Sequence, residues 1–191
     1  MKRILSILLT LCLCSMAVFA DEQGDEYDDG YVYQQNGAGD RFLKIELDGL
    51  FPLNFGDSLK PGFGVNLGYY KFFSDKFAVG GEVMVTNSFS IGNKALFMIP
   101  LTGGIIFQPS AGKFEFPLLL NVGLATETWA SMSYWPALTF KASAGVYYRF
   151  SESWSFGAST SFMSITELFA KNQKQQTGMF VTGALNARYH F

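Results

Sequence analysis

The sequence predicts an all-β protein that forms one eight-stranded antiparallel up-and-down transmembrane β-barrel. Three observations support this fold class. Eight segments alternate between an apolar face and a polar or small face with a period of two residues, as strands between two unlike environments do. The connections between these segments alternate between short and long. The apolar face carries the large side chains, and the opposite face carries mostly small, uncharged ones.

Length and composition limit the alternatives. The chain has 191 residues, of which 49% are hydrophobic and 16% are charged. This size suits one domain, and the composition excludes a disordered chain, which has few aromatic residues and many charges. The formal net charge is −2, and no basic block stands out. We therefore expect no nucleic-acid partner.

The first twenty residues have the organisation of a secretory signal peptide. Two basic residues precede an apolar run over 4–19, and small residues lead up to Ala20. The alternative is a transmembrane anchor, but a run of about 16 residues is shorter than the roughly 20 that span a bilayer. We expect Sec-type export and cleavage after Ala20. The mature chain then contains no cysteine, because Cys12 and Cys14 both precede that point.

An acidic arm follows the signal peptide. Residues 21–40 hold seven acidic residues and no basic residue, which is typical of a solvated, flexible segment. Residues 41–191 hold nine acidic and twelve basic residues and carry the alternating pattern. The predicted organisation is therefore a cleaved signal peptide over 1–20, a flexible arm over 21–40 and a barrel over 41–191.

The alternation is clearest at the C-terminus. From Met179 to Phe191 every second residue is apolar or small, while Asn186, Arg188 and His190 lie between them. The same pattern recurs upstream, and the predicted strands are 42–55, 63–73, 77–86, 95–108, 114–126, 140–150, 154–163 and 178–191. The fourth strand is the least regular, because Leu96 and Pro100 blur its pattern.

The connections are arranged as in an outer-membrane barrel, with short turns on one rim and longer loops on the other. The short connections are 74–76, 109–113 and 151–153, and the longer ones are 56–62, 87–94, 127–139 and 164–177. An even number of strands places both chain ends on the rim of short turns, which faces the periplasm in such barrels.

A soluble barrel would alternate as well, but it would bury its large apolar residues and expose its charges. Here the bulky face consists of Phe, Leu, Val and Tyr, and charged residues are sparse on the other face. A water-facing surface is roughly 25–35% charged. Aromatic residues also cluster near the predicted short turns, as in the girdle of a membrane barrel. A membrane barrel is therefore favoured, and a soluble periplasmic ligand-binding barrel is the alternative.

Three segments carry a family resemblance. These are the terminal strand 178–191 with its final aromatic residue, the motif FPLLLNVG over 116–123 and the motif GVYYRFSESWSF over 145–156. Over 41–191 the chain resembles the small eight-stranded bacterial outer-membrane proteins of the OmpW, OmpX and OmpA-barrel class. The resemblance implies an outer-membrane location, with outer-membrane lipid as a partner. It also implies delivery by periplasmic chaperones and insertion by the barrel-assembly machinery, with Tyr189 and Phe191 in the assembly signal.

The predicted lumen contains charged residues that must pair. Side chains nearly fill an eight-stranded barrel, and an unpaired buried charge costs several kcal/mol. The predicted luminal polar network comprises Lys44, Glu46, Asp48, Glu82, Glu115, Lys141, Arg149 and Arg188. We expect it to plug the periplasmic half, centred on Glu46, Glu82, Glu115 and the two arginines. It either only fills the lumen and holds the strand register, or it lines a path for ions or solutes.

The predicted loops offer candidate contacts. Trp129, Tyr134 and Trp135 lie in the predicted loop 127–139, where exposed aromatic residues form either a binding patch or anchors at the membrane interface. The segment 164–176 has Ile165, Leu168 and Phe169 at helical spacing, which suggests a short amphipathic surface helix.

No catalytic, metal or cofactor site is predicted. His190 is the single histidine and lies at the periplasmic end, so no Ser-His-acid set forms at the outer rim. The predicted function is a monomeric structural or surface-interaction barrel, or a narrow channel for small hydrophobic solutes, as the resemblance to OmpW implies. The further alternatives are the soluble ligand-binding barrel and a lipid-modifying enzyme.

Overall fold

The computed structural model describes residues 36–90, 94–129, 132–168 and 177–191. The predicted signal peptide and most of the predicted arm lie outside these ranges. Among the described residues, no helix is long and apolar enough to cross a membrane.

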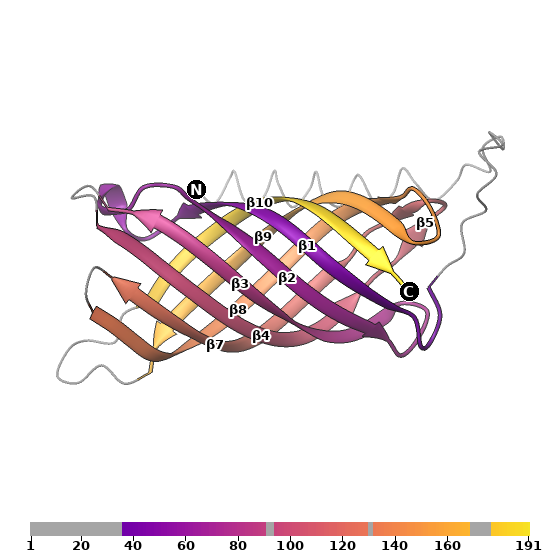
Figure 1. Cartoon of the computed structure of the whole chain (residues 1–191), viewed down its shortest axis with the longest axis horizontal. Coiled ribbons are helices and arrows are strands. Elements are labelled where there is room, and N and C mark those ends of the chain that lie inside the picture. The colour runs from indigo at the N-terminus through magenta and orange to yellow at the C-terminus, as the bar shows by residue number, and fades with distance from the viewer. Residues whose placement is uncertain (1–35, 91–93, 130–131, 169–176) are drawn as a thin grey trace, which may run out of the picture. The chain divides into compact units, whose positions relative to one another are not determined.

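Eight long strands form the wall of the protein (Figure 1). They are β1 (Arg41–Pro52), β2 (Gly62–Phe72), β3 (Phe77–Phe89), β4 (Ala95–Phe107), β7 (Leu118–Trp129), β8 (Met132–Arg149), β9 (Trp154–Glu167) and β10 (Thr177–His190). A single 3₁₀ turn, η1 (Gly56–Ser58), follows β1. The short strands β5 (Ser110–Ala111) and β6 (Phe114–Glu115) form a small hairpin between β4 and β7.

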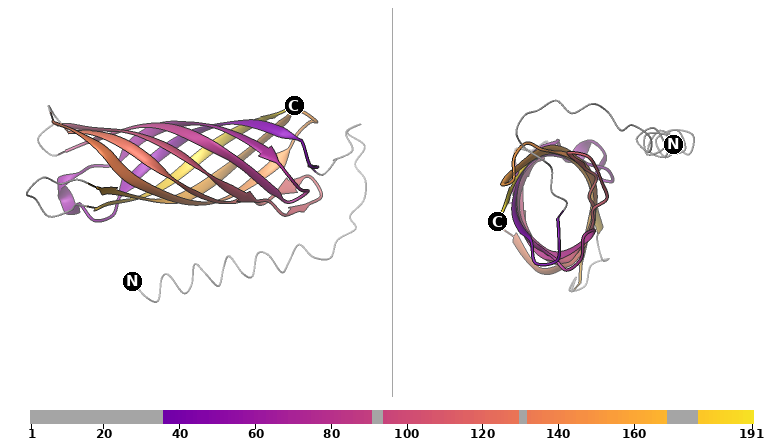
Figure 2. Two further views of the ribbon diagram at one scale, coloured as in Figure 1. Left: turned by 90° about the horizontal axis from the view of Figure 1, so that it is seen from below. Right: turned by 90° about the vertical axis from the view of Figure 1, so that its right-hand side faces the viewer.

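Each long strand pairs antiparallel with its sequence neighbour, and β1 pairs with β10 to close the barrel. The view along the axis shows this closed ring (Figure 2). The predicted fold class, an eight-stranded antiparallel up-and-down barrel, is therefore confirmed. We call the end that carries residues 73–76, 108–117 and 150–153 the turn rim, and the opposite end the loop rim.

The strands extend farther toward the loop rim than predicted. The predicted loop 127–139 is almost entirely strand, because β7 runs to Trp129 and β8 starts at Met132. The pairing register shifts between Ala125 and Glu127, and Pro136 lies on the facing strand at this bulge. Because proline lacks the N–H that a regular ladder needs, a bulge is a place where a strand can contain it. The predicted helix over 164–176 is also wrong at its start, since β9 continues to Glu167. The rest of that segment lies outside the described residues.

The fifth predicted strand is interrupted near the turn rim. The structure divides 114–126 into β6 and β7, separated by Phe116 and Pro117. Pro117 cannot donate to a neighbouring strand, although its carbonyl accepts a hydrogen bond from the Gly145 N–H.

The end of the predicted acidic arm, residues 36–40, is hydrogen-bonded to the barrel. The Gly39 N–H donates to the Phe72 carbonyl, and the Phe72 N–H donates to the Asp40 carbonyl. The Asn36 side chain is buried. Residues 36–40 are thus part of the turn rim, whereas the predicted flexibility of 21–35 concerns residues outside the described ranges.

The large apolar residues face outward, as the membrane interpretation predicted. Leu185 is 70% exposed, Leu101 65% and Leu47 61%. Aromatic side chains form part of the expected girdle at the turn rim, with ring centroids 5.1 Å apart for Trp154 and Tyr189 and also 5.1 Å apart for Phe77 and Phe107. This arrangement contradicts the soluble-barrel alternative, in which such residues would fill the interior.

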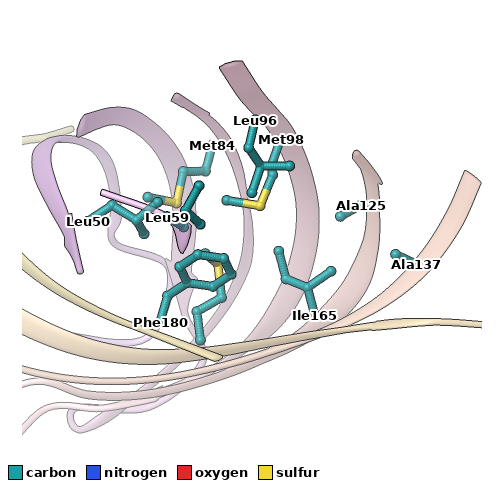
Figure 3. Close-up of a cluster of buried hydrophobic side chains, with 10 residues drawn as sticks. Leu50, Leu59, Met84, Leu96, Met98, Ala125, Ala137, Ile165 and Phe180 are labelled. Carbon is teal, nitrogen blue, oxygen red and sulfur yellow. The ribbon is translucent and has the colours of Figure 1, made fainter. Parts of the chain in front are cut away.

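The lumen is layered, which the sequence analysis missed. Along β1 the inward side chains follow the order Phe42, Lys44, Glu46, Asp48 and Leu50. Apolar clusters lie at both ends of this series. The turn-rim cluster comprises Phe42, Tyr70, Phe72, Ala78, Ile106 and Leu119. The loop-rim cluster comprises Leu50, Leu59, Met84, Leu96, Met98, Ala125, Ala137, Met163, Ile165 and Phe180 (Figure 3).

Candidate functional site

The polar lumen is the candidate functional site. Strand alternation points every second residue inward, and all eight predicted network residues are buried, with Arg149 the most exposed at 7%. All eight therefore lie inside the barrel, on the face that the alternation predicts. Their ion pairs fall into two clusters, which meet where Lys44 and Arg188 are direct cross-strand partners. Their union into one network stays a prediction.

The first cluster lies midway between the two apolar clusters. We call Lys44, Glu46, Glu82 and Lys141 the central quartet. Nζ of Lys44 lies 3.1 Å from Glu46 Oε2 and also pairs with Glu82. Nζ of Lys141 lies 3.2 Å from Glu46 Oε2 and 2.9 Å from Glu82 Oε2. Each lysine therefore bridges both carboxylates, and the quartet has no net charge.

Neutral neighbours complete the coordination of the quartet. The Asn66 amide donates to both carboxylates, at 2.9 Å to Glu82 Oε2, and Ser159 Oγ donates to Glu46 Oε1 at 3.2 Å. Gly68 leaves the necessary space, because a Cβ there would lie 3.2 Å from Lys44 Cε. Asn66 lies on the inward face of β2. The alternation was therefore sufficient to predict that its side chain is buried, but it could not predict its hydrogen-bond partners.

Asp48 does not join the quartet. Its side chain is buried, but it makes no salt bridge among the described residues, and its Oδ2 has no hydrogen-bond partner there. Asp48 is the next inward residue of β1 after Glu46, and its place in the charged network stays a prediction.

The second cluster, the arginine cluster, lies at the turn rim around Glu115. Nη1 of Arg149 lies 3.3 Å from Glu115 Oε1, and Nη1 of Arg188 lies 3.6 Å from Glu115 Oε2. Asn36 adds a link that the sequence analysis missed, since Arg149 Nη1 donates to Asn36 Oδ1 at 3.1 Å. His190 lies 2.8 Å from Arg149 through its Nδ1.

Arg188 is held between two aromatic rings. Its Cζ lies 3.5 Å from the centroid of Tyr147 and 4.7 Å from that of Phe42. Its Nη1 donates to Gln108 Oε1 at 2.7 Å. A planar guanidinium can stack and hydrogen-bond at the same time, which an ammonium group cannot do.

We therefore expect Arg188→Lys to lower the free energy of unfolding by about 1–2 kcal/mol, because the cation remains while the stacking is lost. Urea unfolding of the mature chain refolded in phosphatidylcholine vesicles measures this. Lys60→Arg is the control, since Lys60 is exposed at the loop rim, and we expect a change within about 0.5 kcal/mol. Equal effects of the two substitutions would refute the structural role of the stack.

A Ser–His contact lies in the arginine cluster. Ser155 Oγ is 2.9 Å from His190 Nε2, and both side chains are buried. A nucleophilic triad needs a carboxylate that accepts from the other ring nitrogen, but here that position is occupied by the donor Arg149. The contact is therefore a structural hydrogen bond and not a catalytic arrangement.

The aromatic residues expected in a loop do not form one patch. Trp129 lies at the end of β7 and packs against the loop-rim cluster. Trp135 lies on β8 and is 63% exposed on the outer face, whereas Tyr134 is half-buried opposite Glu127. The three residues therefore do not form one binding patch, and their alternative role as anchors at the membrane interface stays a prediction.

Tyr189 and Phe191 lie on the outer face at the turn rim, with ring centroids 6.2 Å apart. Their predicted role as an assembly signal stays a prediction. In the part of the chain that the structure describes, no group of three or more His, Cys, Asp or Glu residues could hold a metal ion.

Comparison with known proteins agrees with this geometry. A protein-family model matches residues 23–189, which is most of the chain. The chain therefore belongs to that family. Neisserial surface protein A aligns with a TM-score of 0.64 at 8% identity, over 80% of this chain and 99% of that one. The chain is an eight-stranded β-barrel of the outer-membrane type. The barrel also resembles OprG of Pseudomonas aeruginosa (TM-score 0.56, 16% identity, 82% of this chain, 97% of that one).

A third similar structure is Ail, the attachment invasion locus protein of Yersinia pestis, with a TM-score of 0.55 at 18% identity over 80% of this chain and 99% of that one. Two Treponema pallidum proteins without a functional name are similar in sequence. One is 31% identical over 130 residues, which is 68% of this chain, and the other is 24% identical over 147 residues. The matches span 59% and 50% of those relatives' own lengths.

Proposed function

We propose that the protein is an integral outer-membrane barrel with a structural or surface-interaction role, whose lumen does not conduct ions. The observation that carries this proposal is the filling of the lumen by the two apolar clusters, the central quartet and the arginine cluster. The cavity between Lys44, Tyr147 and Arg188 measures about 10 Å³. This is about the room that one water molecule needs, and far less than a conducting path requires.

The proposed biogenesis follows from the class of the barrel. Residues 1–20 direct Sec-type export, periplasmic chaperones carry the chain, and the barrel-assembly machinery reads the end of β10 at Tyr189 and Phe191. The turn rim then faces the periplasm and the loop rim faces outward, as in barrels of this type. We propose a monomer, because β1 and β10 close the wall and leave no strand edge for a partner.

Two features bear on the finer role. Ail is named for attachment and invasion and has also been crystallised with a heparin analogue, which is why a surface-interaction role is part of the proposal. We propose no enzymatic activity, since the Ser155–His190 contact lacks an acid partner.

A channel for small hydrophobic solutes is the second candidate. The loop-rim cluster favours it, because its ten residues are apolar and three of them are methionines, which adapt their shape readily. In the structure these side chains fill the space that a solute would need, so entry requires them to move. Uptake of a labelled hydrophobic solute into vesicles, with and without the protein, separates the two roles.

The conductance of the barrel tests the principal proposal. We expect the mature chain, refolded and inserted into a planar bilayer, to give no steady single-channel current, because charged and apolar layers close the lumen. Boiling-dependent gel mobility verifies folding beforehand. A reproducible unit conductance from the folded protein would overturn the closed-lumen proposal while leaving the barrel intact.

A further inference from the structure

The outer surface carries an unusual pair of charges at the turn rim. Arg41 on β1 and Lys71 on β2 are direct cross-strand partners, and both are exposed. The alternation of each strand places them on the outward face, in line with Leu43 and Tyr69 in the next row. Both cations therefore point away from the lumen, in one of the last rows of the outer face, where the exposed Phe73 follows Lys71.

Like charges in this position repel each other. Directly opposed residues of an antiparallel pair have Cβ atoms roughly 4.5–5.5 Å apart, and like charges there are destabilising. Among the described residues neither cation takes part in a salt bridge. An anion bound between the two side chains would remove this repulsion.

The position of the pair along the barrel axis indicates which anion it could meet. Tyr69, Phe191 and Tyr189 form a ring series in the girdle, with Tyr69 and Phe191 6.4 Å apart. The pair lies one outward-facing row beyond Tyr69, a step of two residues, or about 5 Å along the axis of a tilted strand. Phe191 lies in the same row as the pair, because its N–H donates to the Arg41 carbonyl oxygen. Since aromatic girdles lie at the level of the lipid headgroups, the pair lies at headgroup depth.

We propose that Arg41 and Lys71 bind the phosphate group of a phospholipid in the periplasmic leaflet. A guanidinium fork and a flexible ammonium suit one phosphodiester, the first by bidentate hydrogen bonds and the second as a point charge. The inference rests on the proposed membrane location and orientation. Acidic residues of the arm are the competing occupant, but Asn36 enters the lumen beside Arg149 and Glu115, on the opposite side of the wall from the pair.

Native mass spectrometry tests this site. The mature chain is refolded in a non-ionic detergent and titrated with phosphatidylglycerol. We expect the R41Q/K71Q double variant to need roughly 10- to 30-fold more lipid for half-occupancy, since each basic residue near a membrane surface contributes about a factor of five. The control is K60Q/K94Q, which removes two exposed lysines at the loop rim and should bind lipid as the native chain does.

Three further arms separate the outcomes. Diacylglycerol, which lacks the phosphate, should not distinguish native chain from double variant. If millimolar inorganic phosphate displaces the lipid, the assignment to lipid is overturned. If the chain binds lipid only after four acidic residues of the arm are changed to amides, the arm is the occupant of the pair instead. These residues are Asp25, Glu26, Asp28 and Asp29. Equal lipid retention by native and double-variant chains, both shown folded by boiling-dependent mobility, refutes this inference alone. A chain that never folds in detergent or bilayers refutes the proposed function as well.

Discussion

Glu82→Ala should lower the free energy of unfolding by about 3–5 kcal/mol, because it leaves a buried cation without its partner. Lys44 and Lys141 both pair with Glu82, and after the substitution they share Glu46 alone. Water cannot easily compensate, since both lysines are about 3% exposed. Urea unfolding of the vesicle-embedded barrel, followed by tryptophan fluorescence and gel mobility, measures the loss.

A second substitution distinguishes the lost ion pair from lost packing. Lys44→Met in the Glu82→Ala background restores charge balance, because Glu46 and Lys141 then remain as a 1:1 pair. The double variant should therefore be more stable than the sum of the single effects predicts, by about 1–3 kcal/mol. Glu152→Ala at an exposed turn position serves as the control and should change stability by less than about 0.5 kcal/mol. Additive single effects would mean that the quartet is not coupled.

The alternation in the sequence was sufficient to predict the barrel and the burial of its charges. Period two assigns each residue to a face, so Glu46 and Lys141 could be placed inside without any structure. Their pairing could not be predicted, since they lie on β1 and β8, which are not neighbours in the wall. Contact across the lumen depends on strand tilt and stagger, which a one-dimensional pattern does not contain.

Apolar residues on the inward face were the main source of error inside the barrel. Leu96, Met98 and Ile106 are buried at inward positions of β4. In the sequence they are apolar, as the lipid-facing residues are, so their hydrophobicity did not show that they lie inside. The sequence therefore could not distinguish a polar lumen from one with apolar layers at both ends. The ends of β7 and β8 were missed because the sequence alone did not show that a bulge lets both strands continue through 127–139.

Gly104→Ala should destabilise the barrel by about 3 kcal/mol or more, because the wall has no room for a methyl group at this inward position. A Cβ on Gly104 would lie 1.9 Å from the Leu120 carbonyl oxygen and 2.7 Å from Asn121 Cα. Both are backbone atoms of β7, which pairs with β4 at this point. A side-chain rotation therefore cannot relieve the clash, and the two strands must separate. Urea unfolding and the yield of heat-modifiable protein after refolding measure the effect.

Gly183→Ala is the matched control, with an expected effect of opposite sign. Gly183 lies on the outer face of β10, and a Cβ there would have no atom within 4 Å. The added methyl group would meet only lipid, while the unfolded chain would lose conformational freedom, so we expect a gain of about 0.4–1 kcal/mol. The contrast separates close approach of the strands from the general cost of replacing glycine in a sheet. Similar effects at the two positions would show that the inner wall is looser than its geometry indicates, and this would also weaken the argument for a closed lumen.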